Sequence, residues 1–180
     1  MSRLYLPFIL LLLIALQGTT AAFIPNFLLE HGWIIVFHSV FVFLVLFTLF
    51  YDLEHTYYSL FFAILSGVLI DIVYTSVVGV YMFSYAITIY FVHGMRKLLH
   101  ANFFVALLLT VVGIAMADYV LYFIYLFTGF TNIEALDYFY YRMLPTVLIN
   151  TLIFLLFYLI FKRKLVKWSE LRFEKKGSIN

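Results

Sequence analysis

Two aspartates, Asp71 and Asp118, lie inside long apolar runs of this 180-residue chain and carry its clearest potential for chemistry. A carboxylate in an apolar environment can relay protons, hold a ligand or bond neighbouring helices. Placing an aspartate at the centre of a membrane helix costs about 2.5–3.5 kcal/mol, so its side chain is expected to face the protein interior or a wet cavity. Asp71 and Asp118 are the two acids of the chain to which this applies.

Catalysis has little support in the sequence. There is no HExxH motif, no P-loop, no glycine-rich nucleotide motif and no Ser/His/Asp arrangement at a known spacing. The five histidines are scattered over loops and helix ends and indicate no metal site. The chain has no cysteine, which excludes disulfides, thiolate nucleophiles and Cys-ligated metals. We expect no enzyme activity, no cofactor, no metal and no nucleic-acid partner.

The composition indicates an integral membrane protein. Hydrophobic residues make up 66% of the chain and charged residues only 11%, with a mean hydropathy of +1.09. A soluble domain carries about 25% charged residues, so the expected solvent for this surface is lipid. Helices satisfy their backbone hydrogen bonds internally, and lipid selects them for that reason. The sequence therefore predicts an all-α membrane protein.

Six apolar segments are long enough to cross a bilayer as helices. They are expected near residues 4–23, 33–51, 57–73, 77–95, 102–127 and 143–161. This assigns residues 1–161 to a six-helix transmembrane domain and 162–180 to a basic cytoplasmic tail. The first segment is predicted to remain as a span, although the TTAAF that ends it also resembles a signal-peptide cleavage site.

The basic residues predict the orientation. With the N-terminus inside, ten of the 11 Lys and Arg residues lie inside and only Arg142 lies outside, as the positive-inside rule requires. Both termini are then cytoplasmic. Contacts with cytoplasmic proteins are expected at five basic residues, Arg96, Lys97, Lys162, Arg163 and Lys164. The tail itself is either an interfacial or docking helix or, as we favour, the ordinary basic flank of a last span.

Polar residues converge on the outer half of the predicted bundle. Counted from the inner ends of their helices, Asp71 lies about 21 Å deep and Asp118 about 24 Å deep. The same half holds Gln17, His38, Arg142 and Asn150. This cluster has three interpretations: interhelical contacts that fix register, a docking surface for a partner helix, or a ligand pocket open to the outside. A proton relay is disfavoured, because two acids at one depth make no path across the membrane.

The surroundings of Asp71 are more specific. Ala63, Gly67 and Asp71 are spaced four residues apart and share one helix face, on which Ala63 and Gly67 let another helix approach closely. Gly79 follows after a tight turn that leads into the next segment. This face is predicted to be a partner-binding surface or part of the structural core. The carboxylate can also cap the next helix by accepting hydrogen bonds from its free amides.

Residues 61–91, FFAILSGVLIDIVYTSVVGVYMFSYAITIYF, resemble the rod shape-determining protein MreD family. The resemblance rests on Gly67, on Asp71 in an apolar helix, on the short turn and on Gly79 before the next helix. The chain length, the six predicted spans, the N-terminal arginine and the basic tail are also similar to that family.

The resemblance implies a non-enzymatic scaffold in the bacterial cytoplasmic membrane, required for rod shape and side-wall peptidoglycan synthesis. The implied partners are MreC, MreB, and RodA with its transpeptidase. It also implies a fold similar to the substrate-binding subunits of energy-coupling-factor transporters, which have six helices and an outward-facing pocket. The alternative function is therefore a substrate-binding membrane subunit of a small-molecule, vitamin-type uptake system.

Overall fold

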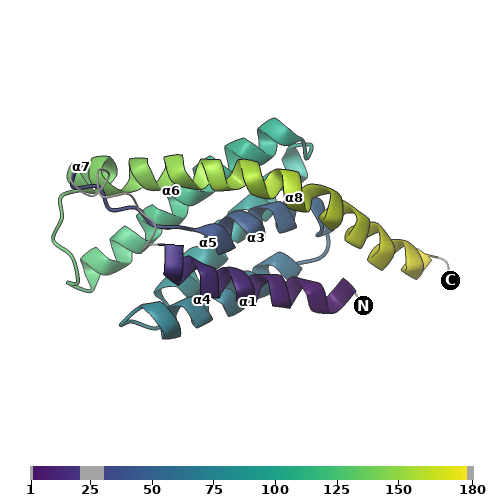
Figure 1. The fold of residues 1–180 in the computed structure, drawn as a ribbon, viewed down its shortest axis with the longest axis horizontal. Coiled ribbons are helices and arrows are strands. Elements are labelled where there is room, and N and C mark those ends of the chain that lie inside the picture. The colour runs from purple at the N-terminus through teal and green to yellow at the C-terminus, as the bar shows by residue number, and fades with distance from the viewer. Residues whose placement is uncertain (1, 21–30, 178–180) are drawn as a thin grey trace.

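The computed structural model describes residues 2–20 and 31–177, with side chains from 5 to 20 and 31 to 172. Within these ranges the chain is helical and contains no strand, which confirms the all-α class. The long helices are α1 (Ser2–Thr20), α3 (Ser39–Phe50), α4 (Tyr58–Tyr74), α5 (Val80–Leu98), α6 (Phe103–Phe127) and α8 (Leu144–Gly177). A short helix α7 (Ala135–Tyr138) and a π-helical turn η2 (Phe139–Met143) lead into α8. The long helices form one bundle (Figure 1).

Two stretches are long and apolar enough to cross a bilayer, α6 and the continuous helical run Ala135–Arg172. The other apolar helices in the described ranges are shorter, among them the 12-residue α3. α8 runs through residue 161 without a break and continues to Gly177, so the described part of the basic tail is helical. α1 begins and α8 ends at the same end of the bundle (Figure 1).

The second predicted segment differs from the structure. The sequence predicts a helix over 33–51, but α3 begins only at Ser39, and residues 33–38 are non-helical. The reason is competition for backbone hydrogen bonds, because side chains of α8 and the backbone of Tyr141 bond this segment. Buried backbone groups outside a helix need other hydrogen-bond partners, and those of Ile34, Val36 and His38 find them in the chain itself.

α3 is the central helix of the bundle. All 12 of its residues are buried, and it contacts each of the five other long helices. Its sequence, SVFVFLVLFTLF, is apolar all round, as expected of a helix with no exposed face. The only hydroxyls on it belong to Ser39 and Thr48, and Thr48 donates to the carbonyl of Leu44 in its own helix. The bundle is therefore built around an element that water and lipid do not reach.

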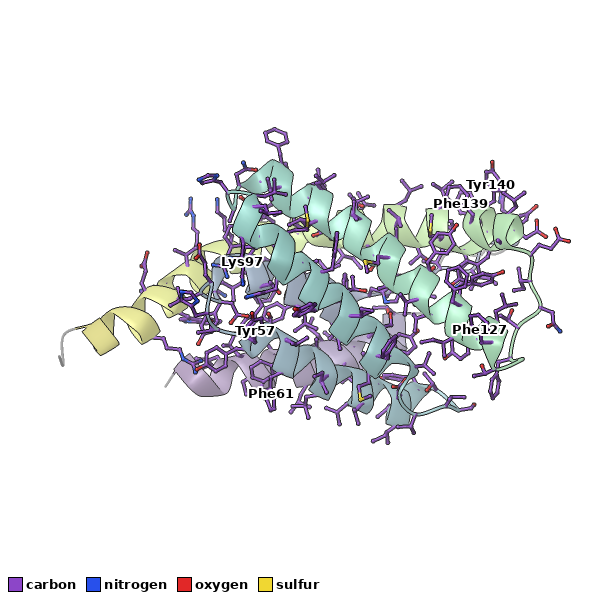
Figure 2. The ribbon with its side chains drawn as sticks, turned by 180° about the vertical axis from the view of Figure 1, so that it is seen from behind. Tyr57, Phe61, Lys97, Phe127, Phe139 and Tyr140 are labelled. Carbon is purple, nitrogen blue, oxygen red and sulfur yellow. The ribbon has the colours of Figure 1, made fainter. Side chains whose placement is uncertain are left out.

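The two ends of the bundle differ in character. Lys97 and Tyr57 lie at one end, and Phe127, Phe139 and Tyr140 lie at the other (Figure 2). We call these the basic end and the aromatic end. At the basic end α8 is fastened to the α3–α4 turn, because the Ser169 hydroxyl donates to the carbonyl of Tyr51.

Candidate functional site

Asp71 lies in the last turn of α4 and is fully buried. Its Oδ2 accepts hydrogen bonds from the backbone N–H groups of Gly79 at 2.8 Å and Met82 at 3.2 Å, and its Oδ1 accepts one from Tyr81 at 3.0 Å. Gly79 has a positive φ of 106°, a conformation that glycine adopts without strain. These contacts make Asp71 the cap of α5, because they satisfy amides that have no partner within that helix.

The small-residue face of α4 packs against α5. Ala63 and Gly67 are both buried, and a Cβ added at Gly67 would lie 2.5 Å from the Cα of Met82. Such a distance leaves no room for any side chain at this position. The face that the sequence singles out thus ends at the carboxylate of Asp71, and its described contacts are with the neighbouring helix.

Asp118, on α6, is fully buried in a different environment. Its Oδ1 lies 3.5 Å from Nε of Arg142 and 3.8 Å from Nε2 of His38. Neither carboxylate oxygen has a hydrogen-bond partner among the described residues. Its backbone carbonyl, in contrast, accepts a hydrogen bond of 3.0 Å from the Tyr138 hydroxyl. The carboxylate is thus held by charge and proximity rather than by close hydrogen bonds.

His38 and Asn150 connect Asp118 to the non-helical segment 33–38. The Asn150 side chain accepts from the backbone N–H of His38 at 2.7 Å and donates to the carbonyl of Val36 at 2.7 Å. Nδ1 of His38 lies 2.9 Å from the hydroxyl of Tyr85. The side-chain amide of Asn150, on α8, therefore provides hydrogen-bond partners for the N–H of His38 and the carbonyl of Val36.

The structure brings most of the predicted outer cluster together. His38, Asp118 and Arg142 are in contact, and Asn150 bonds the backbone of His38, whereas Oε1 of Gln17 has no hydrogen-bond partner among the described residues. Asp71 stands apart, because its two oxygens are occupied by the amides of α5 and by Thr75. The cluster is thus a network around Asp118, with Asp71 as a separate cap.

Sequence reasoning missed three contributors to this network, Tyr85, Tyr138 and Thr146. Tyr85 lies one helical turn after Tyr81 on α5, and this pair of hydroxyls in an apolar helix was an available signal. Nothing in the sequence marks Tyr138, because its partner is a backbone carbonyl of α6.

Asp52 is a further buried acid. It lies in the turn that also holds Glu54 and His55, and its side chain is only 1% exposed. Its Oδ2 accepts a hydrogen bond of 2.8 Å from the backbone N–H of Ser59, in the first turn of α4. Burial raises the pKa of Asp52, and the hydrogen bonds from Ser59 moderate that rise. Asp52 therefore caps α4 at the basic end much as Asp71 caps α5.

The five predicted basic contact residues lie in different environments. Arg96 is partly buried near Asp52, Nζ of Lys97 lies 5.9 Å from the ring centroid of Tyr57, and Nζ of Lys162 lies 5.0 Å from that of Tyr158. Arg163 and Lys164 are exposed on α8. Among the described residues, no group of three His, Cys, Asp or Glu side chains is arranged to hold a metal ion.

Comparison with known proteins gives a family. The model of the rod shape-determining protein MreD family matches residues 2–167. The rod shape-determining protein MreD of Bacillus subtilis (strain 168) is 26% identical over 180 residues, which cover 92% of this chain and 98% of that protein. No solved structure matches, so the expected likeness to energy-coupling-factor subunits stays a prediction. The match over nearly the whole chain shows that the chain belongs to the rod shape-determining protein MreD family.

Proposed function

We propose that this chain is a non-enzymatic, multi-pass scaffold of the bacterial cell membrane that supports rod shape and side-wall peptidoglycan synthesis. It acts by binding MreC, MreB, and RodA with its transpeptidase. The family match over residues 2–167 supports the rod-shape role. The partners are those that membership of this family implies.

The observation that carries the scaffold proposal is where the buried polar groups make their bonds. Asp52, Asp71 and Asn150 all bond backbone groups of the chain itself, and each stabilises an irregular connection. An arrangement of this kind fixes the positions of helices, which a docking platform needs, and leaves these side chains unavailable for catalysis.

Both surfaces that partners need are exposed on the described part of the chain. Large apolar side chains such as Phe104, Phe127 and Leu159 are at least 76% exposed and suit contact with lipid or with partner helices. Arg163 and Lys164 project from α8 at the basic end, which we place in the cytoplasm, and suit a cytoplasmic protein.

Co-purification tests the proposal. The tagged full-length chain is purified in mild detergent, and the proteins and small molecules that accompany it are identified by mass spectrometry. Recovery of MreC and the wall synthases supports the scaffold. Recovery of ATPase subunits, or of a small ligand in equal amount, would instead support the uptake subunit and overturn the scaffold.

Variants of Asp71 sharpen this test. Asp71→Leu removes all three bonds to α5, while Asp71→Asn keeps one acceptor oxygen, so the leucine variant should recover less MreC and disturb cell shape more. If both variants behave like the wild type, Asp71 is not needed for partner binding or for cell shape. The variants must be compared at equal amounts in the membrane, which separates assembly from expression.

A further inference from the structure

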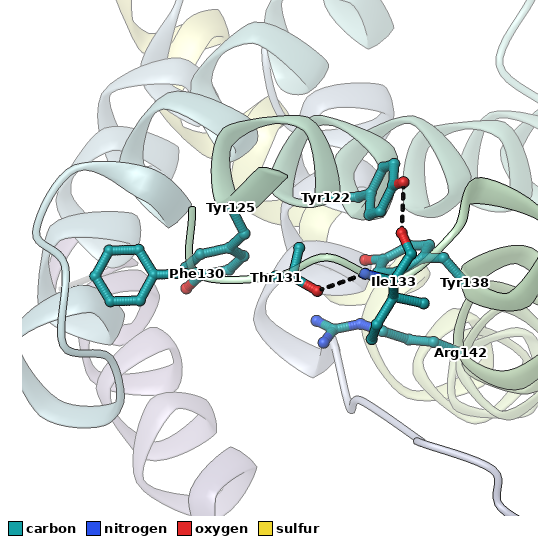
Figure 3. Close-up of a pocket in the computed structure, with 7 residues that line it drawn as sticks. All are labelled: Tyr122, Tyr125, Phe130, Thr131, Ile133, Tyr138 and Arg142. Atoms are coloured by element: carbon teal, nitrogen blue, oxygen red, sulfur yellow. Dashed lines mark hydrogen bonds between the residues drawn. The ribbon is translucent and has the colours of Figure 1, made fainter. Parts of the chain in front are cut away.

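A cavity of about 320 Å³ opens beside the Asp118 network at the aromatic end. It is formed by α6, the loop after it, α7 and η2, as Figure 3 shows. Its lining residues are Tyr122, Tyr125, Phe130, Thr131, Ile133, Tyr138 and Arg142. The scaffold proposal assigns this space no role. Its volume is at the small end of the range of about 300–1,000 Å³ typical of ligand pockets.

Arg142 gives the cavity its charge. Nε of Arg142 faces Asp118 at 3.5 Å, while the two terminal nitrogens extend into the cavity below Thr131 (Figure 3). Nε of Arg142 has no hydrogen-bond partner among the described residues, and the side chain is 21% exposed. A guanidinium has five N–H donors and no acceptor, so its cavity side can donate to water or to an anion that enters the cavity.

The walls of the cavity are fixed by the chain's own hydrogen bonds. The Tyr122 hydroxyl donates to the carbonyl of Ile133 at 2.9 Å, and the Tyr138 hydroxyl donates to the carbonyl of Asp118 at 3.0 Å. Thr131 Oγ1 accepts from the N–H of Ile133, which leaves its hydroxyl proton free to donate. The cavity thus combines a preformed frame with donors that face inward.

The charge balance selects the ligand. Nε of Arg142 faces the carboxylate of Asp118 at 3.5 Å, so the cavity meets the opposite side of a guanidinium that already has one anionic neighbour. A ligand with one negative charge is enough to pair with that side. A phosphodiester carries one negative charge spread over two oxygens, and these match the planar fork of a guanidinium.

The position of the cavity indicates where the phosphodiester comes from. Tyr140 and Tyr141, in the same turn η2 as Arg142, are 58% and 48% exposed, as expected of tyrosines that lie at a membrane–water interface. Phospholipid headgroups lie at the same level. Arg142 is presented by the π-helical turn η2, a feature often found at functional sites. We propose that the cavity around Arg142 binds the phosphodiester headgroup of a phospholipid in the adjacent leaflet.

Lipid binding to the full-length chain in detergent tests this proposal. Dihexanoyl phosphatidylglycerol, whose headgroup is a phosphodiester with one net negative charge, is titrated and counted per chain by native mass spectrometry. We expect one saturable site. Two variants address the cavity in different ways: Arg142→Gln removes the donor, and Thr131→Trp fills the space while leaving the Asp118–Arg142 pair intact. Each should weaken binding at least tenfold, while Lys167→Gln, exposed on α8 near the basic end, should leave it unchanged.

Inorganic phosphate distinguishes the two sources of this chemistry. If phosphate up to high millimolar concentration fails to displace the lipid, the ligand is a lipid headgroup, as proposed. If phosphate alone saturates the site and the lipid does not bind, the lipid source is overturned and the ligand is a soluble phosphate. Lipid binding that neither cavity variant weakens would overturn the site itself. Because this assay contains no partner protein, its result does not depend on the proposed scaffold function.

Discussion

Asp71 and Asp118 are both fully buried in apolar helices, yet their carboxylates differ in the hydrogen bonds that they accept. The carboxylate of Asp71 accepts three hydrogen bonds from backbone amides of 3.2 Å or less. That of Asp118 accepts none from described residues and lies 3.5 Å from Arg142 and 3.8 Å from His38. The carboxylate of Asp71 therefore has hydrogen bonds on both oxygens, and that of Asp118 has none from described residues.

This difference assigns the two acids different roles. A carboxylate that satisfies several buried amides stabilises the fold, because removing it leaves each amide unpaired. A carboxylate with open oxygens beside a partly exposed arginine can adjust to a ligand or a proton. The comparison therefore predicts that variants at Asp71 cost more stability than variants at Asp118.

The largest effect is expected from Asp71→Leu. It leaves the buried N–H of Tyr81 and the part-buried N–H groups of Gly79 and Met82 without an acceptor, at about 1–3 kcal/mol for each buried group and less for the others, so the chain should lose about 3 kcal/mol of stability. Asp71→Asn is the control, because it keeps one acceptor oxygen and should lose about half as much. Thermal unfolding in detergent measures both. Equal unfolding temperatures for the two variants would contradict the capping role.

Gly67→Ala should have the next largest effect. The added methyl group would lie 2.5 Å from the Cα of Met82, so α4 and α5 must move apart, at a cost of about 1–3 kcal/mol. Gly94→Ala is the matched control, since a Cβ there meets nothing within 4 Å and alanine favours the helix. The two variants should therefore shift the unfolding temperature in opposite directions. A neutral Gly67→Ala would show that the contact between α4 and α5 is looser than the structure indicates.

The cap of Asp71 could be predicted from sequence because the interaction is local. Asp71 and Gly79 are separated by only eight residues and one tight turn, so the carboxylate and the free amides must lie close together. The small-residue spacing of Ala63 and Gly67 likewise predicted a face for close helix packing. Both signals lie within one helix and the start of the next.

The Asp118 network could be predicted only in part. Counting residues from the helix ends predicted that His38, Asp118 and Arg142 lie in one half of the bundle. Such a count cannot show which helices are neighbours. The non-helical segment 33–38 was missed because its hydrogen-bond partners, Thr146 and Asn150, lie more than 100 residues away in sequence. An apolar run long enough to form a helix gives no sign that distant side chains will compete for its backbone.

Asp118→Asn should cost less than the changes at Asp71 and Gly67. It removes the charge that faces Arg142, but Arg142 is 21% exposed and can reach water, so we expect about 1 kcal/mol rather than the larger cost of a fully buried pair. The double variant Asp118→Asn, Arg142→Gln should lose less stability than the sum of the single variants. Chemical unfolding of the wild type, the two single variants and the double variant gives the interaction free energy between the two side chains. Strict additivity would show that the 3.5 Å approach contributes no interaction.

The smallest effect concerns Asp52, the third buried acid and, like Asp71, a cap. Burial raises its folded-state pKa above 3.8, which means that the folded chain holds the proton more tightly than the unfolded chain does. The stability from this group is therefore complete below pH 3.8 and is lost as the pH rises through the folded-state pKa. Asp52→Asn removes the titration but keeps an oxygen for the N–H of Ser59.

The stability of the wild-type chain should thus fall relative to that of Asp52→Asn as the pH rises above 3.8, measured by unfolding temperature at several pH values. Asp137→Asn, at an exposed acid in α7, controls for the loss of one negative charge. A difference between wild type and Asp52→Asn that does not change with pH would mean that Asp52 is not desolvated in the folded chain. A difference that grows with pH would show that Asp52 stabilises its helix less when charged than when protonated, because the cost of its burial exceeds the gain from its hydrogen bonds with Ser59 and Thr56.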